Sequence, residues 1–247
     1  MEIVKVKNRL LDTDLVIYQN NDWFKFSLDS VLLSKFVTIN LKHKKIIDLA
    51  TGNAPIPLLL SFRTKAIIYG IEYQKCVFDL AKQSVLENNK DSQIKLICGD
   101  VRTLKKEFNS DSFDVVTCNP PYFKTDNSEF FNNNDVKTLA RHEVTLTLDD
   151  VLKNASYLLK NGGIFAMVHR TERFIEIMEV MKQYHIEPKR VQFIYPKKGR
   201  DSDLFLIEGI KNGRCGLKML SPLVVHNEDN TYTEEVLEIL DFSGDAK

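Results

Sequence analysis

The chain has 247 residues, of which 43% are hydrophobic and 28% are charged, and its 34 basic residues balance its 34 acidic ones. This composition is typical of a folded globular protein of one large domain, and it excludes disordered, collagen-like and low-complexity classes. A net charge of zero argues against broad, sequence-independent binding of polyanions, although a local basic patch can still set the field at a cleft.

The first 44 residues are a polar lead-in in which the sequence predicts one short helix, over residues 27–36. From residue 45 onward, short apolar strands alternate with helices, which indicates βαβ units, a parallel sheet and right-handed crossovers. The predicted strands lie at 46–49, 66–71, 94–98, 113–118 and 164–168, and the predicted helices at 55–62, 74–87, 148–159 and 172–184.

The pattern changes after residue 188, where three strand-like stretches follow one another at 190–195, 204–210 and 217–225. Turns are predicted at Lys198-Gly199 and at Lys211-Asn212-Gly213, and the Asn-Gly pair is a hairpin signal. We therefore expect the sheet to end in antiparallel strands or to carry a small β extension, followed by a loosely attached acidic end. The predicted organisation is a lead-in over 1–44, an α/β domain over 45–225 and an acidic tail over 226–247.

Several features favour a reducing compartment, and we expect a cytoplasmic protein. No two of the four cysteines have the spacing of metal ligands or of a C-x-x-C motif, so neither a metal site nor a disulfide framework is expected. The N-terminal residues lack the apolar segment of a signal peptide, and the longest apolar runs are far below the roughly 18 residues of a spanning helix. We expect no membrane contact and no obligate protein partner.

Polar residues follow four of the predicted strands, at the sheet edge where open parallel sheets bind ligands. The first strand ends in Asp48 and leads into a turn of small residues over 50–54. Small residues let backbone amides approach a ligand closely, and the N-terminus of the next helix favours negative charge. The single Gly52 argues against a pyrophosphate fingerprint, and a plain tight turn is the competing interpretation.

Two further carboxylates, Glu72 and Asp100, follow the second and third strands. Glu72 lies 24 residues after Asp48, near the roughly 20-residue offset of an acidic residue that accepts from a ribose. The Asp100 carboxylate can accept from an exocyclic amine of adenine. Either residue by itself could be merely solvated, but three acidic ends on successive strands favour a shared role.

The most specific feature is Asn119-Pro120-Pro121-Tyr122, which follows the fourth strand. Two prolines stiffen the backbone and remove two N–H donors. Carbonyls in this segment and the Asn119 side chain then remain fixed acceptors for an –NH₂ group, and Tyr122 offers a flat face to the planar system that carries it. The competing interpretation is a Pro-Pro turn that leaves a strand.

In their order along the chain, 48–54, Glu72, Asp100 and the N-P-P-Y motif resemble the motifs of class I S-adenosylmethionine-dependent methyltransferases. The N-P-P-Y subgroup methylates planar exocyclic or amide nitrogens. Within it, residues 5–240 are similar to the bacterial tRNA1(Val) adenine-37 N6-methyltransferases, with support from 26–33, 140–143 and 221–226. One departure is that Ala50, Ala54 and Pro55 stand where that family's first loop usually carries more glycines.

The resemblance implies a Rossmann-like α/β fold with a mostly parallel seven-stranded sheet and antiparallel C-terminal strands. It implies S-adenosylmethionine as cofactor, N6-methylation of adenine as activity and tRNA as the substrate, with a lead-in that closes the cofactor pocket. The implied cofactor-binding residues are Phe26, Asp29, Asp48, Ala50, Thr51, Gly52, Asn53, Glu72, Tyr73, Asp100, Val101 and Asn119. The implied catalytic residues are Asn119, Pro120 and Tyr122. The implied substrate-binding residues include Pro121, Tyr122, Phe123, Arg141 and His142.

In this mechanism the Asn119 side-chain oxygen and a carbonyl at Pro120 hold the amine hydrogens and meet charge that develops in the transition state. Tyr122 stacks on a base that has left its neighbours' stack. Neither a metal nor a strong general base is required, because a methylated amine loses its proton readily.

Charge is segregated along the second half of the chain. Residues 186–219 hold eight basic and four acidic residues, a net charge of +4, whereas 226–247 hold seven acidic residues and one lysine. A solvated face is the common meaning of such a run, and an edge that contacts phosphates is the alternative. On the second of these interpretations, we assign three cations around the predicted turn to substrate binding: Lys197, Lys198 and Arg200.

Other functions remain open at this stage. Release-factor glutamine methyltransferases use the same N-P-P-Y logic, but they carry a substantial helical domain before the first motif, whereas 47 residues precede Asp48 here. An rRNA or DNA amine methyltransferase is closer and harder to exclude. A non-catalytic RNA-binding protein is disfavoured, because the strand-end carboxylates and the whole N-P-P-Y motif are present.

Overall fold

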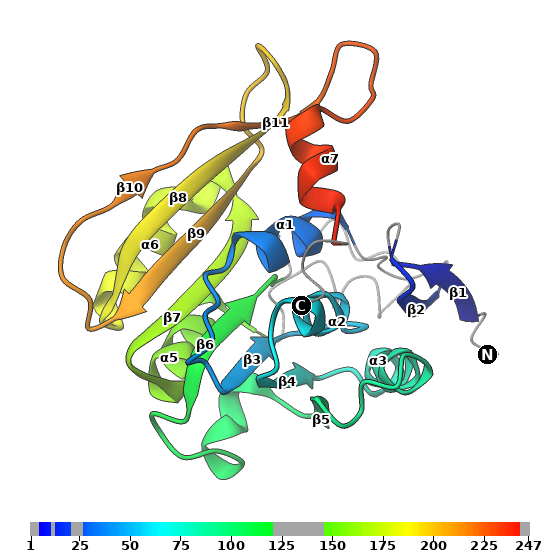
Figure 1. The fold of residues 1–247 in the computed structure, drawn as a ribbon. Helices are drawn as coiled ribbons and strands as arrows, with labels where there is room; N and C mark the ends of the chain where they lie inside the picture. Colours follow the sequence, from blue (N-terminus) through cyan, green and yellow to red (C-terminus); the bar gives the residue numbers. More distant parts are fainter. Residues whose placement is uncertain (1–4, 11–12, 21–26, 121–145, 243–247) are drawn as a thin grey trace, which may run out of the picture.

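The computed structural model describes residues 5–10, 13–20, 27–120 and 146–242. A nine-stranded sheet with helices on both faces forms its centre, and a two-stranded sheet lies beside it (Figure 1). The strands are β1 (Lys5–Arg9), β2 (Val16–Asn20), β3 (Lys45–Leu49), β4 (Ile67–Glu72), β5 (Ile94–Cys98), β6 (Phe113–Cys118), β7 (Leu159–Arg170), β8 (Ile186–Lys197), β9 (Leu204–Lys211), β10 (Lys218–Met219) and β11 (Leu223–His226). The helices are α1 (Leu28–Phe36), α2 (Pro55–Arg63), α3 (Lys75–Glu87), α5 (Leu148–Leu158), α6 (Phe174–Gln183), α7 (Glu234–Leu240) and the 3-10 helices η1 (Val101–Lys106) and η3 (Thr171–Arg173).

The central sheet has the strand order β10-β8-β9-β7-β6-β3-β4-β5, and β11 also pairs with β8. β9 runs antiparallel to β7 and to β8, and the other pairings of this sheet are parallel. The carboxyl ends of β3, β4, β5, β6, β7 and β8 therefore lie along one edge. The predicted α/β class, with a mostly parallel sheet and an antiparallel strand near the C-terminus, is confirmed.

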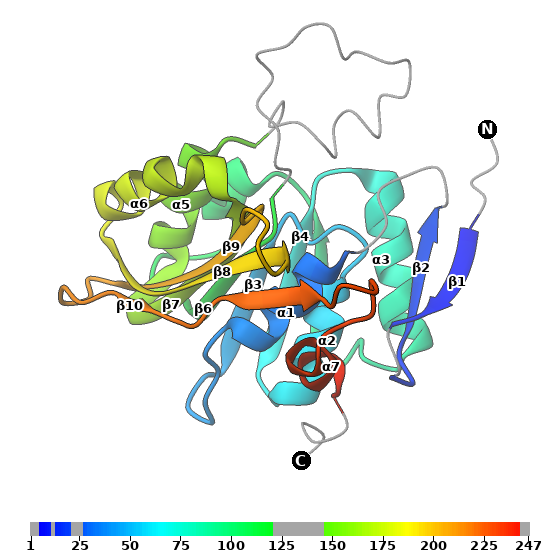
Figure 2. The same ribbon diagram turned by 90° about the horizontal axis from the view of Figure 1, so that it is seen from above.

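Apolar side chains of the central strands point alternately into two cores, one on each face of the sheet. Ile46 and Val115 belong to the core under α1, α2, α3 and α7, while Ile47 and Val116 belong to the core under α5, α6 and η1. Figure 2 shows α5 and α6 on one side of the strands, and α1, α2 and α7 on the other. Coverage of both faces explains why these strands are near-continuous apolar runs.

Two short strands, β10 and β11, extend the sheet beyond the seven strands that the resemblance implied. They replace the single strand expected over 217–225, and both run parallel to β8. The hairpin prediction at Asn212-Gly213 is wrong, because the chain crosses the start of β8 after β9 instead of turning back along it. There the Asn212 N–H donates to the His185 carbonyl at 2.7 Å. The true hairpin is the β8–β9 connection, in which Gly199 has a φ of +76°.

The N-terminal lead-in contains more structure than the one predicted helix. β1 and β2 form an antiparallel hairpin, and β2 packs on α3. The Val16 N–H donates to the Asn88 side chain at 2.8 Å, and the Tyr18 N–H donates to the Ser84 hydroxyl at 2.9 Å. Tertiary contacts of this kind stabilise strands that are too short to show a clear period in the sequence.

The described part of the acidic C-terminal segment, residues 226–242, is packed on the domain, so the expectation of a loose attachment is wrong for these residues. This segment forms α7, which begins at the N-cap Thr233 and packs against β11 and α1. Val236 and Phe242 are buried, and the Lys35 ammonium lies 3.9 Å from the centre of the Phe242 ring. Acidic residues in the first turn of a helix interact favourably with its N-terminus, so the same charges stabilise an ordered element.

Among the helices that the structure describes, none is long and apolar enough to cross a membrane. Several predicted site residues lie outside the described residues, and their roles stay predictions: Phe26, Pro121, Tyr122, Phe123, Arg141 and His142.

Candidate active site

Polar residues at four strand ends meet at the carboxyl edge of the sheet. β3 lies between β4 and β6, and β5 pairs with β4. Asp48 and Glu72 lie at the ends of β3 and β4, Asp100 follows β5, and Asn119 follows β6. The chain builds the sheet outward from β3 to β5 and then returns to place β6 on the other side. This reversal is the switch point at which open parallel sheets bind their ligands.

Asp48 is fully buried, and two hydroxyl groups hold its carboxylate. The Thr51 hydroxyl donates to one oxygen at 2.6 Å, and the Thr117 hydroxyl of β6 donates to the other at 2.7 Å. Burial raises the pKa of Asp48 to about 7, although both hydroxyl donors favour the charged form, and the nearby Glu72 raises it further. Asp48 can therefore change its charge near neutral pH.

The loop after β3 passes through three left-handed residues, Ala50, Gly52 and Ala54, with φ of +54°, +59° and +69°. Glycine adopts this backbone freely, whereas it costs other L-residues roughly 1–2 kcal/mol. The two alanines thus occupy positions where glycine is the default residue. The loop therefore differs from the glycine-richer loop of the resembled family in its side chains, whereas its backbone is left-handed at all three of these positions.

Glu72 binds this loop from the neighbouring strand. Its Oε2 accepts from the Gly52 N–H at 3.0 Å, and its Oε1 accepts from the Gln74 N–H at 2.8 Å. Burial raises the pKa of Glu72, and the backbone donors oppose the rise. Because a carboxylate offers about four acceptor positions, Glu72 can hold the loop and still accept from a ligand.

Asp100 is engaged by its own neighbour, Arg102. The carboxylate accepts from the Arg102 N–H at 2.9 Å, which caps η1, and it pairs with the guanidinium at 2.6 Å. This partner holds the pKa of Asp100 below its usual range. An adenine amine would have to share the carboxylate with Arg102, so the adenine contact of Asp100 stays a prediction.

Asn119 follows β6 and is joined to α1. Its Nδ2 donates to the Ser30 hydroxyl oxygen at 3.1 Å, and Pro120 after it is buried. Asp29, which was predicted to line the pocket, lies in the first turn of α1 next to Ser30. Thr117, two residues before Asn119, carries the bond to the carboxylate at the end of β3. The end of β6 therefore connects the acidic part of the site with α1.

The other predicted cofactor residues differ in exposure. Asn53 is buried, and its amide donates to the Tyr18 carbonyl of β2 at 3.1 Å, which brings the N-terminal hairpin to the border of the site. Val101 is buried at the start of η1, whereas Tyr73, directly after β4, is 53% exposed. An exposed ring beside a buried carboxylate offers an apolar face to a planar ligand group.

The model of the methyltransferase-domain family matches residues 40–239, which is most of the chain. This chain belongs to the methyltransferase family. The matched range contains the ends of β3, β4, β5 and β6, so the site described above lies within the methyltransferase domain.

Curated relatives of this methyltransferase carry a more specific name. A tRNA1(Val) (adenine(37)-N6)-methyltransferase from Bacteroides fragilis is 26% identical over 210 residues, which cover 84% of this chain and 87% of the relative. The protein of the same name from Bacteroides thetaiotaomicron is 27% identical over 214 residues, which cover 85% and 87%.

Solved structures share the fold of this methyltransferase. A predicted O-methyltransferase from Agrobacterium tumefaciens superimposes with a TM-score of 0.70 at 20% identity, covering 87% of this chain and 96% of that one. A geranyl diphosphate C-methyltransferase from Streptomyces coelicolor, in complex with S-adenosyl-L-homocysteine, has a TM-score of 0.56 at 11% identity, covering 74% and 79%. A geranyl diphosphate methyltransferase in complex with S-adenosylmethionine has a TM-score of 0.56 at 12% identity, covering 74% of this chain and 84% of that one.

The residues at the switch point fit S-adenosylmethionine as the cofactor. Glu72 retains acceptor positions that suit the two hydroxyls of a ribose, and the buried Asp48 can meet a cationic group as a carboxylate. The loop after β3 borders open space at Gly52, where an added Cβ would meet no atom within 4 Å. Glu72, Asp48 and the loop between them would hold the cofactor, and Tyr73 would contact its planar part.

Lys197, Lys198 and Arg200 lie at the same edge in the other half of the sheet. β8, which ends at Lys197, is antiparallel to β9, as β7 is, so the ends of β7 and β8 point the same way. β9 and β7 separate β8 from β6. The structure therefore does not bring these three cations into contact with the residues around Asn119.

Two residues of the site were missed from the sequence, Ser30 and Thr117. Both are buried and both bind a predicted site residue from another element. In the sequence, each of the two is a hydroxyl residue in an otherwise apolar stretch of a helix or central strand. Such a residue is expected to be buried and hydrogen-bonded, but the sequence does not indicate which residue it binds.

Proposed function

We propose that this methyltransferase methylates N6 of an adenine in tRNA, with adenine 37 of tRNA1(Val) as the target. The observation that carries the proposal is the position of Asn119 and Pro120 directly after β6. They lie at the switch point of the sheet, at the same edge as the Asp48 and Glu72 carboxylates. A side-chain amide and a fixed carbonyl suit a planar amine as the methyl acceptor. The two Bacteroides relatives, which carry this activity in their names, support the choice of adenine in tRNA.

The chain's own residues act on the acceptor. When bound, S-adenosylmethionine supplies a methyl group on a positively charged sulfur. Asn119 Oδ1 and the Pro120 carbonyl accept the two N–H groups of the adenine amine, and the following proline keeps this backbone stiff. As the amine nitrogen gains positive charge, both acceptors hold it more strongly, which lowers the barrier. The methylated amine releases its proton readily, so no strong general base is needed.

The adenine reaches these acceptors only after it leaves the stack of its neighbours. Tyr122, which lies outside the described residues, is proposed to stack on the extruded base. Its role needs the face of the ring and not the hydroxyl group. We assign Pro121, Phe123, Arg141 and His142 to the substrate side on the same proposal.

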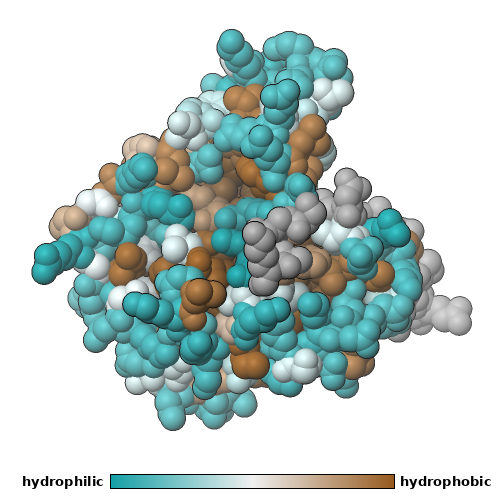
Figure 3. Space-filling view, viewed as in Figure 1, coloured by the Kyte–Doolittle hydropathy of each residue, from teal (hydrophilic) through white to brown (hydrophobic). Residues whose placement is uncertain are grey.

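The β8–β9 turn is the proposed docking site for the rest of the tRNA. Together with the segment between β11 and α7, this turn forms the projection at the top of Figures 1 and 3, whose surface is mainly hydrophilic in that view. A groove of about 520 Å³ lies between these two segments. It is lined by Pro196, Lys197, Arg200, Asp201, Asp203, His226 and Asn230.

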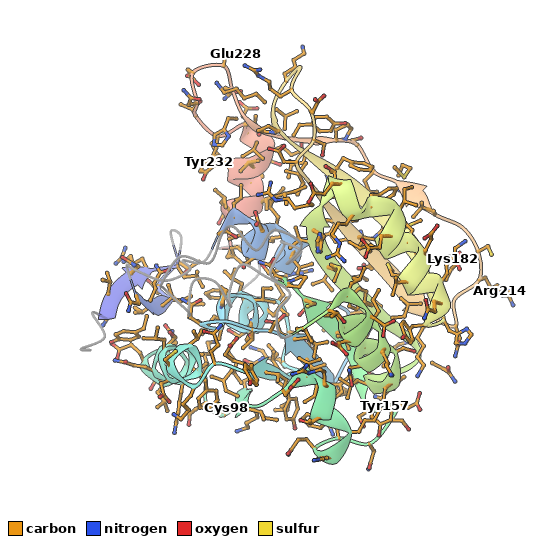
Figure 4. All side chains as sticks on the ribbon, turned by 180° about the vertical axis from the view of Figure 1, so that it is seen from behind. Cys98, Tyr157, Lys182, Arg214, Glu228 and Tyr232 are labelled. Atoms are coloured by element: carbon orange, nitrogen blue, oxygen red, sulfur yellow. The ribbon has the colours of Figure 1, made fainter. Side chains whose placement is uncertain are left out.

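Contacts across the groove hold its two walls together. The Lys197 ammonium donates to the Glu228 carbonyl at 2.9 Å, and Figure 4 shows Glu228 and Tyr232 on the same segment. His226 Nδ1 lies 3.3 Å from the Pro196 carbonyl oxygen across the groove, and within its own wall the His226 ring stacks on that of Tyr232 with centroids 5.1 Å apart. Because the lining combines cations with carboxylates, it suits a nucleotide better than a bare phosphate: base amines donate to carboxylates, and phosphates bind cations.

The proposed function is tested by incubation with labelled S-adenosylmethionine and total tRNA that lacks the modification, followed by nucleoside analysis. We expect labelled N6-methyladenosine, with tRNA1(Val) as the labelled species after hybrid selection. Labelled protein with unlabelled RNA would contradict the proposal and favour the release-factor alternative. Label in rRNA or DNA amines alone would keep the chemistry and overturn the substrate.

A further inference from the structure

The carboxylate of Asp100 is engaged on both oxygens by one residue, Arg102. Its Oδ1 accepts from the Arg102 backbone N–H at 2.9 Å and from Nε at 3.0 Å, and its Oδ2 accepts from Nε at 3.0 Å and from Nη2 at 2.6 Å. Chemistry fixes the direction of each bond, because a guanidinium only donates and an ionised carboxylate only accepts. Since a carboxylate offers about four acceptor positions, Arg102 occupies the places that a further donor would need.

This ion pair lies at the edge of the sheet where the cofactor is proposed to bind. Asp100 follows β5, which pairs with β4, and the Gly99 N–H between them donates to the Glu72 carbonyl at 2.9 Å. The side chains of Asp100 and Arg102 are 21% and 45% exposed. Both members of the pair are therefore open to a ligand that approaches from solvent.

The backbone holds Asp100 in place without the Arg102 side chain. The Arg102 N–H caps the 3-10 helix η1, and Thr103 donates its N–H and its hydroxyl to the Asp100 carbonyl, both at 3.0 Å. Asp100 raises the pKa of Arg102 and Asp150 of α5 adds to the rise, so a second carboxylate lies near the guanidinium. The guanidinium can thus leave Asp100 while the carboxylate keeps its position.

We propose that Arg102 competes with the adenine amine of the cofactor for Asp100, and thereby lowers the preference of the site for an amino base over an oxo base. The amine takes the acceptor places of Nε and Nη2, while the backbone N–H of Arg102 keeps its own. An oxo base gains nothing from this exchange, because its oxygen accepts and is better served by the guanidinium. The inference rests on the proposed function, in which S-adenosylmethionine is the methyl donor.

Arg102→Met tests the competition, since it removes the side-chain donors and keeps the backbone N–H that caps η1. The amino ligand is S-adenosyl-L-homocysteine, and the oxo ligand is S-inosyl-L-homocysteine, in which a carbonyl replaces the amine. By isothermal titration calorimetry, we expect the variant to bind the amino ligand about 1.4- to 5-fold more tightly than wild type, as the strength of a partly exposed ion pair predicts. It should bind the oxo ligand no more tightly than wild type does.

Lys105 provides the matched control, because residues three apart lie on one face of a 3-10 helix. It is exposed, and its ammonium lies 4.9 Å from the centre of the Tyr157 ring. Lys105→Met removes the same charge from η1 and leaves the side-chain donors of Asp100 in place. We expect it to change the affinities for the two ligands by the same factor.

The Nε–H signal of Arg102 in a ¹⁵N NMR spectrum reports the exchange directly. It is assigned by its disappearance in Arg102→Met, and we expect the amino ligand to shift it more than the oxo ligand does. A signal that S-adenosyl-L-homocysteine leaves unmoved would overturn the inference. So would weaker binding of the amino ligand by Arg102→Met, or an equal effect on both ligands, whereas a merely structural ion pair would lower the Tm and leave the ratio of affinities unchanged.

The proposed function and this inference fail on different results. A wild-type protein that binds S-adenosyl-L-homocysteine but methylates no tRNA would contradict the proposed function, and the affinity ratio would still decide the role of Arg102. A wild-type protein that binds neither ligand would overturn the inference together with the choice of cofactor.

Discussion

Asp48 is the residue whose chemistry depends most on its surroundings. Burial raises its pKa from the ordinary 3.8 to about 7. Between these two pH values the folded protein retains a proton that the unfolded chain has released, so the contribution of Asp48 to the free energy of unfolding falls as the pH rises from about 4 to about 7. A cationic ligand favours the carboxylate and therefore binds more tightly as the pH rises through this range.

Replacement of Thr117 by valine tests this coupling. The variant keeps the shape of the side chain and removes one of the two hydroxyl donors that favour the charged Asp48. We expect the affinity for S-adenosylmethionine to rise with pH in both proteins, with the midpoint displaced to higher pH in Thr117→Val. Isothermal titration calorimetry at half-unit steps from pH 6 to 9 measures the displacement.

Thr51→Val removes the other hydroxyl donor and should displace the midpoint in the same direction. Glu72, the neighbouring carboxylate, is present in all three proteins and contributes the same background. Equal affinities at pH 6 and pH 8 in the wild-type protein would show that the Asp48 charge does not act on the cofactor.

At the scale of elements, β3 and β4 together form the half of the site in which we propose that the cofactor binds. Gly70 of β4 lies opposite Asp48 in the parallel register. A Cβ at Gly70 would lie 2.8 Å from the Leu96 side chain, closer than real contacts allow, and 3.0 Å from that of Thr51, close enough that Thr51 would have to shift slightly. The absence of a side chain at Gly70 therefore makes room for the threonine whose hydroxyl holds Asp48.

Gly70→Ala is expected to act on stability and on cofactor binding together. Overpacking of this kind costs about 1–3 kcal/mol, and displacement of Thr51 weakens its bond to Asp48. We expect a lower midpoint in urea unfolding and a several-fold weaker affinity for S-adenosylmethionine.

Gly99→Ala, directly after the neighbouring strand β5, is the control for Gly70→Ala. Its added Cβ would meet its nearest neighbour, Ile97, at an ordinary 3.7 Å. It should therefore leave both the urea midpoint and the affinity close to wild type. A Gly70→Ala protein that loses stability but keeps full affinity would show that Thr51 does not transmit the strain to the cofactor site.

At the scale of the whole molecule, β6 divides the carboxyl edge of the sheet into two halves. Asp48, Glu72 and Asp100 lie on the side of β3, β4 and β5, whereas Lys197, Lys198 and Arg200 lie on the side of β7 and β8. Asn119, at the end of β6, lies at the boundary. Such a division suits an enzyme that receives its cofactor from one side and a large anionic substrate from the other.

Joint replacement of Lys197, Lys198 and Arg200 by alanine tests the substrate half. We expect the KM for tRNA to rise while the affinity for S-adenosylmethionine is unchanged. The salt dependence of tRNA binding should also flatten, by a slope of roughly 0.7–0.9 for each phosphate contact that is lost. Fluorescence anisotropy of labelled tRNA at several salt concentrations measures both quantities.

Three cations at the opposite, amino edge of the sheet provide a control of equal charge: Lys42, Lys44 and Lys45 are exposed at the start of β3. Their replacement by alanine should change the salt slope less than replacement of the β8–β9 cations does. Identical slopes and affinities in wild type and the β8–β9 variant would mean that tRNA docks elsewhere on the molecule.

Much of the fold could be predicted from short-range signals. The helix that the sequence predicts over 148–159 is present as α5, and its N-cap Thr147 forms a capping box with Asp150. Apolar runs located β3, β4, β5 and β6, and their polar ends located Asp48, Glu72, Asp100 and Asn119. These signals suffice because capping, hydrophobic period and strand length depend on residues that are near one another in the sequence.

The partners of those residues could not be predicted in the same way. Ser30 and Ser34 are buried serines one turn apart on α1, yet one binds Asn119 and the other binds its own helix. Thr117 reaches Asp48 across 69 residues of chain. The sequence by itself determined which elements form and which polar residues end the strands. Only the tertiary structure decided which hydroxyl meets which site residue, because that choice depends on how distant elements pack and not on the local pattern of either one.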